Sequence, residues 1–205
     1  MARPADISEK RILEVARDLF LERGIAATEM KEIAARAQIG RSSLYRYFPS
    51  KEDLAFQIAA EILAALQPQN LPETECTDGR AQLRAVLEQI TALLLTHPRE
   101  VRLLDEFDQL FSGPYPEIEA ARRYVEFNRT FFCTPVEDAL RHGKADGSLR
   151  YDLPDPLACR LLINTLLAAA QRVLPRAAHL REEQGYAEEY LTALPALLVE
   201  GLSAK

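Results

Sequence analysis

The segment QIGRSSLYRYFPSK at residues 38–51 gathers hydroxyl, phenol, guanidinium and ammonium groups within one short stretch. Leu44, Tyr47 and Phe48 stand at i, i+3 and i+4, so a helix over 41–48 would bury these three side chains on one face. The opposite face would carry Arg41, Ser42, Tyr45 and Arg46. Arginine and serine pair with base edges, and tyrosine and lysine suit phosphate oxygens, so the pattern indicates DNA binding. The solvated face of an ordinary amphipathic helix has the same spacing and stays open as the alternative.

Two preceding helices would position this segment. The first has apolar side chains at helical spacing over 12–20, and Gly24 provides a natural stop. The second is predicted to begin at Thr28, a residue type favoured as an N-cap, and to continue to Ala37. A turn of three or four residues then leads into the helix over 41–48, which is the helix-turn-helix arrangement.

Helical periodicity continues through the rest of the chain. A fourth helix is predicted over 51–66, with Ser50 and Asp53 as a capping-box pair at its start, after Pro49 ends the third helix. Further helices are predicted at 80–97, 98–112, 116–143, 154–175 and 185–203. Pro135 should kink or split the segment at 116–143. Because no segment alternates for long like a strand, the sequence predicts an all-α fold.

The net charge of −6 is unevenly distributed along the chain. Residues 1–54 contain ten Lys or Arg and nine Asp or Glu, whereas the remainder contains fifteen and twenty-two. Charges act over about one Debye length, roughly 8–10 Å at moderate salt. A basic edge of an acidic protein therefore remains able to meet phosphate.

Several functional classes are not supported by the sequence. The polar N-terminal stretch does not resemble a signal peptide, and the apolar run at 161–170 is too short to span a membrane. We therefore expect a cytoplasmic protein without membrane contact. Cys76, Cys133 and Cys159 are widely spaced, and the three His residues are scattered, so no disulfide framework, metal site or cofactor is expected. No Ser-His-Asp order, Gly-rich phosphate loop or paired-carboxylate signature indicates an enzyme.

Residues 12–63 resemble the DNA-binding region of the TetR family of transcriptional regulators. The elements AxxLFxxxG, T…IAxxA and LYxYFxSKxxL stand in the order and at the spacing of that family. The resemblance covers about a quarter of the chain. It implies a homodimeric, all-helical repressor whose affinity for DNA is altered by a small molecule.

The resemblance also implies roles for individual residues. The residues near base edges would be Arg41, Ser42 and Ser43. The residues near phosphates would be Thr28, Tyr45, Arg46 and Lys51. Two positions depart from the family pattern: Gln38 stands where a turn glycine is frequent, and Gly40 stands where a capping Ser or Thr is usual. A glycine N-cap costs only a few tenths of a kcal/mol relative to serine, about 0.3 kcal/mol.

The two C-terminal helices have wide apolar faces. The helix over 154–175 carries apolar residues nearly all the way round, and the last helix carries two neighbouring stripes, one through Leu194 and Leu197 and one through Leu191 and Leu198. Such faces favour a four-helix bundle formed by two copies about a two-fold axis. A larger core within one chain is the alternative.

Aromatic residues concentrate between positions 107 and 132. The candidate ligand-binding residues are Phe107, Phe111, Tyr124, Phe127 and Phe131. Two of these pairs are four residues apart, so aromatic stripes would face one another and line an apolar pocket. Packing within an ordinary core explains the same spacing and stays open.

The sequence therefore predicts two domains. Residues 1–50 would form a three-helix DNA-binding domain with a helix-turn-helix, and residues 51–205 a larger helical domain for ligand binding and dimerisation, joined through the connecting helix over 51–66. The predicted function is a ligand-responsive regulator, in this family usually a repressor, that binds a near-palindromic double-stranded DNA operator as a homodimer and is released by a small-molecule effector. The alternative is a helix-turn-helix regulator that binds DNA constitutively without an effector.

Overall fold

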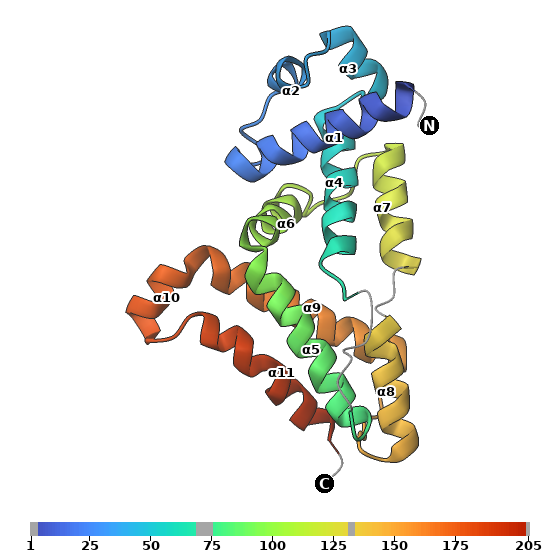
Figure 1. The fold of residues 1–205 in the computed structure, drawn as a ribbon, viewed down its shortest axis with the longest axis vertical. Coiled ribbons are helices and arrows are strands. Elements are labelled where there is room, and N and C mark those ends of the chain that lie inside the picture. The colour runs from blue at the N-terminus through green and yellow to red at the C-terminus, as the bar shows by residue number, and fades with distance from the viewer. Residues whose placement is uncertain (1–3, 69–75, 131–133, 204–205) are drawn as a thin grey trace. The chain divides into compact units, whose positions relative to one another are not determined.

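The structure of the protein, a computed structural model, describes residues 4–68, 76–130 and 134–203 (Figure 1). Its α-helices are α1 (Pro4–Arg23), α2 (Met30–Arg36), α3 (Arg41–Tyr47), α4 (Lys51–Ala65), α5 (Gly79–Thr96), α6 (Pro98–Leu110), α7 (Glu119–Thr130), α8 (Thr134–Asp146), α9 (Asp155–Val173), α10 (Ala177–Gln184) and α11 (Glu188–Leu202). A short 3-10 turn, Leu174–Arg176, links α9 to α10. The all-α fold expected from the sequence is confirmed in the described residues.

Contacts divide the chain into two compact units. Unit 1 comprises residues 1–64 and 103–130, and unit 2 comprises residues 65–102 and 131–205. Each unit has a buried apolar core of its own. The domain boundary at residues 50 and 51 stays a prediction.

In unit 1, the first three helices pack around apolar side chains that the periodicity identified. Ile12, Ile33 and Leu44 are fully buried, one from each of α1, α2 and α3. Gly24 ends α1 in the left-handed region at φ 90°, as the sequence predicted. Its Cα faces the Glu106 carboxylate, and a Cβ here would come within 2.6 Å of that group. Glycine is favoured at this position because a φ of 90° is strained for any residue with a Cβ, and a side chain would also have to displace the Glu106 carboxylate.

The start of α4 is capped as predicted. Ser50 Oγ accepts a hydrogen bond from the Asp53 amide at 3.1 Å, and the Asp53 carboxylate accepts one from the Ser50 amide at 3.1 Å. Each side chain thus satisfies the backbone group of the other, which fixes where the helix begins. Within α4, Leu54, Phe56 and Ile58 are buried, so this helix is a core element of unit 1.

The helical segment predicted at 116–143 is split into α7 and α8, one of the two outcomes predicted from Pro135, which is the second residue of α8. Proline has no amide hydrogen to donate, and the first turn of a helix is where none is needed. Helix α10 lies in a region for which no helix was predicted, and it ends at Gly185, whose φ is 80°.

Unit 2 is a bundle in which α5 packs against α8, α9 and α11. The start of α5 approaches α8 closely, since a Cβ on Gly79 would lie 2.0 Å from the Gly143 nitrogen. Asp146 strengthens this junction by accepting hydrogen bonds from the Gly79 amide at 2.7 Å and the Ser148 amide at 2.8 Å. A hydrogen bond from the Ser148 side chain contributes most to lowering the pKa of Asp146 to about 2, and the two amide bonds add to it.

Helices α9 and α11 are each buried on one side and carry large exposed leucine side chains outside it. Leu166 on α9 and Leu191 on α11 are buried in unit 2, whereas Leu161 and Leu197 are 54% and 73% exposed. Among the described residues, Asp155–Gln184 is long and apolar enough to cross a membrane by length and composition, with 33% of its most apolar window buried. Core helices of globular proteins meet the same criterion.

Candidate nucleic-acid interface

Helix α3 presents a polar face on a small apolar anchor. Leu44 is fully buried, and Phe48, the C-cap residue that follows the helix, is 3% exposed. The residues of α3 that are exposed are Arg41, Ser42, Tyr45 and Arg46, and Ser43 is half-buried. The outward set is the one that the i, i+3, i+4 spacing predicted, and of the predicted inward set Leu44 and Phe48 are buried whereas Tyr47 is half-buried.

The turn before α3 is tight and uses an unusual residue. Gln38 has a φ of 58° and is the one non-glycine residue with a positive φ among those described. The Gln38 and Ile39 amides donate to Ala35 and Ala34 carbonyls at 3.1 and 3.0 Å, which closes the end of α2. Gly40 then serves as the N-cap of α3 without a side-chain hydrogen bond. Of the two residues that depart from the family pattern, Gln38 thus forms the turn and Gly40 is the N-cap of α3.

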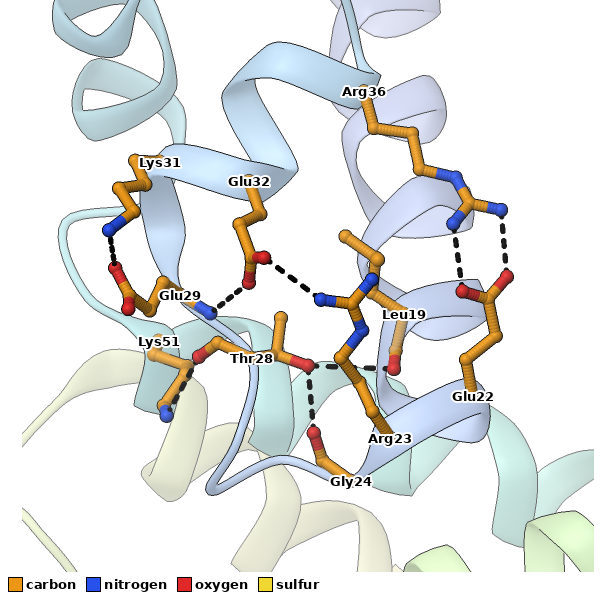
Figure 2. Close-up of polar contacts among 10 residues, drawn as sticks. All are labelled: Leu19, Glu22, Arg23, Gly24, Thr28, Glu29, Lys31, Glu32, Arg36 and Lys51. Carbon is orange, nitrogen blue, oxygen red and sulfur yellow. Dashed lines mark hydrogen bonds and ion pairs between the residues drawn. The ribbon is translucent and has the colours of Figure 1, made fainter.

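Thr28 is placed differently from expectation. Its side chain is 1% exposed, and its hydroxyl donates to the Gly24 carbonyl at 2.7 Å. The N-cap of α2 is Glu29, whose amide donates to the Glu32 carboxylate at 3.1 Å (Figure 2). The prediction of Thr28 as N-cap is therefore wrong, because its hydroxyl turns back to α1. The buried hydroxyl positions the loop and does not face solvent, so a side-chain contact of Thr28 with phosphate lacks support.

Lys51 reaches back from α4 to the loop between α1 and α2. Its Nζ donates to the Ala26 and Thr28 carbonyls, each at 3.0 Å (Figure 2 includes the contact with Thr28). From α6, Glu106 Oε1 accepts a hydrogen bond from the Ala26 amide at 2.9 Å. The Lys51 ammonium thus holds the loop through two of its carbonyls, and the Glu106 carboxylate holds it through the Ala26 amide. No local sequence pattern indicates this role of Glu106, because the two bonded residues are 80 positions apart.

Ion pairs engage Arg23 of α1 and Arg36 of α2. Arg36 makes a bidentate contact with Glu22 at 2.8 and 2.9 Å, and Arg23 pairs with Glu32 at 2.8 Å (Figure 2). Among the ion pairs of the described residues, Arg41 and Arg46 take no part, although the Arg46 guanidinium lies 5.4 Å from the Tyr47 ring centroid. The exposed guanidinium groups of Arg41 and Arg46 accordingly keep hydrogen-bonding capacity to offer a ligand.

The aromatic candidates gather around a residue that the sequence analysis did not single out, Phe56 of α4. Its ring centroid lies 5.0 Å from Phe107, 4.6 Å from Phe111 and 5.5 Å from Tyr124. Tyr115 joins the same cluster at 5.1 Å. Burial raises the pKa of Tyr124 well above its ordinary value, so the phenol stays neutral even in alkaline solution. This aromatic cluster connects α4 with α6 and α7.

Beside the aromatic cluster lies a cavity of about 460 Å³ in unit 1. Side chains from α1, α4, α7 and the connection between α3 and α4 line it, and Tyr124 and Phe127 are among them. Phe107 is 1% exposed and packs within the core, and Phe131 lies outside the described residues. The predicted ligand residues thus divide between core packing and a cavity wall.

Comparison with known proteins gives one consistent result. A family model described as "Bacterial regulatory proteins, tetR family" matches residues 12–58. The HTH-type transcriptional repressor KstR2 of Rhodococcus jostii (strain RHA1) is 30% identical over 166 residues, which is 80% of this chain and 78% of that protein. A tetR-family regulatory protein from Rhodococcus RHA1 has a similar structure, with a TM-score of 0.65, 17% identity and coverage of 97% of this chain and 98% of the other. FadR of Thermus thermophilus, a repressor in complex with lauroyl-CoA, aligns with a TM-score of 0.60 and 24% identity over 96% of both chains.

Proposed function

Since the chain belongs to the TetR family of bacterial transcriptional regulators, we propose that it is a homodimeric repressor that binds a near-palindromic operator and is released by a small-molecule effector. The family consists of DNA-binding regulators and not of enzymes, and the chain is a regulator of this kind. Acting on the chromosome, it would work in the cytoplasm. Repression is supported by the name of the KstR2 relative.

The observation that carries the DNA-binding proposal is the exposed polar face of α3 on its buried Leu44 anchor. Arg41, Ser42 and Ser43, at the start of the helix, would read base edges, with arginine bidentate to guanine. Tyr45, Arg46 and Lys51 would contact phosphates, and Thr28 would contribute by holding the loop.

Footprinting of the DNA upstream of the chain's own gene is the experiment that tests this proposal first. A near-palindromic protected site is the expected result, with half-sites about 34–36 Å apart or somewhat further on distorted DNA. Arg41→Ala should relax the preference at one base position of each half-site by about 1–3 kcal/mol. Equal loss of affinity on every sequence would contradict a base-reading role for Arg41.

The dimer proposal rests on the apolar outer faces of α9 and α11. Leu157 and Leu161 on α9 and Leu197 on α11 are at least half exposed, and a second copy would cover them in a four-helix bundle. Leu197→Glu should give a folded monomer by analytical sedimentation, since the side chain is not part of the core. Leu166→Glu should instead unfold unit 2, because Leu166 is fully buried. A wild-type chain that sediments as a monomer at micromolar concentration would contradict the dimer.

The effector proposal rests on the cavity beside the aromatic cluster. At 24% identity, the likeness to FadR supports a shared fold and says nothing about the ligand of this chain. The support for an effector is therefore the cavity of this chain itself. A ligand there would contact α4, whose first residue Lys51 holds the loop between α1 and α2. Helix α4 is about 22 Å long at 1.5 Å per residue, so a small tilt at one end displaces the other. Phe127→Ala should reduce the response to effector and leave effector-free DNA binding intact.

A constitutive regulator without an effector is the second candidate, favoured by the close packing of Phe107 and Phe111 against Phe56. A thermal-shift screen of small molecules separates the two candidates. Stabilisation by a compound that also lowers operator affinity supports the effector. A chain whose operator affinity no stabilising compound changes supports constitutive binding.

A further inference from the structure

We propose that the cavity between α1, α4 and α7 binds an organic cation with apolar or aromatic substituents. This inference rests on the proposed function, because it assigns a chemical class to the effector that the cavity would take. The cavity lies wholly within unit 1, and each side chain that lines it is described.

The cavity walls are rich in aromatic rings. The aromatic side chains that line it are Tyr47, Phe48, Phe56, Tyr124 and Phe127. Phe48 and Phe56 are buried, whereas Tyr47 and Phe127 are half-buried and present ring surface to the cavity. The volume of about 460 Å³ falls in the range of ligand pockets, roughly 300–1,000 Å³. A molecule of several rings would therefore fit.

The charges on the lining side chains have a clear sign. Among the lining residues there are three carboxylates, Glu9, Asp53 and Glu119, and one guanidinium, Arg123. Arg123 Nε donates to Glu119 Oε1 at 3.0 Å, and the Arg122 guanidinium, which does not line the cavity, lies 3.6 Å from Glu119 Oε2, so the Glu119 charge is offset. Asp53 keeps its charge while its carboxylate accepts hydrogen bonds from the Ser50 amide and hydroxyl at 3.1 and 2.6 Å, and together with Glu9 it leaves the site with an excess of negative charge. An anionic ligand would be repelled, and a cation would be attracted both by the carboxylates and by the ring faces.

One ring of the cavity already binds a cation of the chain itself. The Arg46 guanidinium lies 5.4 Å from the Tyr47 ring centroid, within the distance at which a ring face attracts positive charge. Tyr47 is the last residue of α3 and also lines the cavity. A ligand that moves the Tyr47 ring would therefore act on the end of the DNA-binding helix directly.

A pair of probes of nearly equal shape and opposite charge tests the inference. Tetraphenylphosphonium and tetraphenylborate each carry four phenyl rings, and titration calorimetry of the full chain without DNA measures both. We expect tetraphenylphosphonium to bind at one site per chain and tetraphenylborate to bind at least tenfold more weakly. Equal or tighter binding of tetraphenylborate, or no binding of either probe, would overturn the inference.

Variants distinguish charge from ring contact. Glu9→Gln and Glu119→Gln should each weaken tetraphenylphosphonium binding about fivefold, which corresponds to the loss of one nearby charge interaction in water. Phe127→Ala should weaken both probes alike. Glu126→Gln is the matched control, because Glu126 is an exposed carboxylate of α7 that does not line this cavity, and it should change neither affinity. If Glu9→Gln and Glu119→Gln both leave tetraphenylphosphonium binding unchanged, the cavity carboxylates do not attract the cation, which contradicts the inference.

Operator binding in the presence of the probe separates this inference from the proposed function. If tetraphenylphosphonium binds with the expected charge dependence and operator affinity is unchanged, the result supports a cationic ligand and contradicts regulation of DNA binding through the cavity. If only an anionic compound releases the operator and the cation does not bind, effector regulation stands and the cation assignment fails.

Discussion

The loop between α1 and α2 and the helix α3 use their polar side chains in opposite ways. The Thr28 hydroxyl, the Lys51 ammonium and the Glu106 carboxylate all turn onto the backbone of the loop or the end of α1. The exposed residues of α3, by contrast, point to solvent, and Gly40 caps the helix without a side-chain bond. Polar groups with backbone partners fix a shape, whereas polar groups without them are available to a ligand. In the proposed DNA-binding surface, the loop would therefore position the helices and α3 would supply the contacts.

This division has an energetic consequence for the two regions. The loop is fixed by charge-assisted hydrogen bonds, which are stronger than neutral ones. Helix α3 has seven residues, too few to be stable alone, so its conformation depends on tertiary packing of its apolar side. Loss of one side chain should therefore destabilise the loop through lost hydrogen bonds and α3 through lost apolar packing.

The largest effect is expected for Leu44→Ala. Leu44 is the fully buried residue of α3, and its truncation leaves a cavity under the helix. We expect a loss of about 2–5 kcal/mol in the free energy of unfolding, measured by guanidinium denaturation followed by circular dichroism. Tyr45→Ala is the control, because Tyr45 is 50% exposed and should change stability by less than about 0.5 kcal/mol. Similar losses for the two variants would contradict an apolar anchor for α3.

Lys51→Met should produce the next largest effect. Its two carbonyl partners would lose a charged donor, which costs about 1–2 kcal/mol of unfolding free energy for partly exposed groups. Because one ammonium hydrogen remains for phosphate, the slope of log affinity against log salt should also fall by about 0.9.

Arg46→Ala is the matched variant from α3. It should lower the salt slope by the same amount, about 0.9, with no measurable loss of stability. A stability loss equal to that of Lys51→Met would erase the distinction between positioning and contact. An unchanged slope for Lys51→Met would limit Lys51 to holding the loop.

Local features of this region were predictable from the sequence, and contacts between distant segments were not. The burial of Leu44 and the pairing of Ser50 with Asp53 follow from spacings of three or four residues. Thr28 was assigned as an N-cap because its residue type favours that position, but the same hydroxyl also reaches a carbonyl four residues earlier.

Contacts that depend on how helices dock carry no local signal. Lys51 and Ala26 are 25 positions apart, and the partners of Phe56 come from two other helices. An i, i+4 spacing of aromatic residues predicts that they share a face, and it leaves open whether that face meets a core or a cavity. In this chain Phe107 meets the core and Phe127 meets the cavity.

A smaller effect on the loop side is a dependence on pH at the start of α2. The hydrogen bond from the Glu29 amide lowers the pKa of Glu32, and Arg23 contributes further through its charge. Because the folded-state pKa is depressed, the stabilisation is present above the ordinary value of 4.5 and is lost as the pH falls through the lowered value. The difference in melting temperature between the chain and Glu32→Gln should therefore shrink below pH 4.5. A difference that is constant down to the acid limit of folding would contradict this linkage.

The smallest effect is expected at the cap of α3, on the contact side of the comparison. Gly40 has φ −68° and ψ 147°, which any residue adopts, and the nearest atom to an added Cβ is Ser42 Oγ at 3.9 Å. Serine therefore fits without strain, and its hydroxyl would accept a hydrogen bond from an amide of the first turn. Gly40→Ser should raise the free energy of unfolding by about 0.3 kcal/mol, and Gly40→Ala should lower it, because alanine is a poorer N-cap than glycine. If α3 is held less firmly than the loop, the serine variant should also bind operator slightly more tightly at constant salt slope. Equal stability of the serine and alanine variants would mean that the first turn of α3 does not use a side-chain cap, and that its packing alone determines its position.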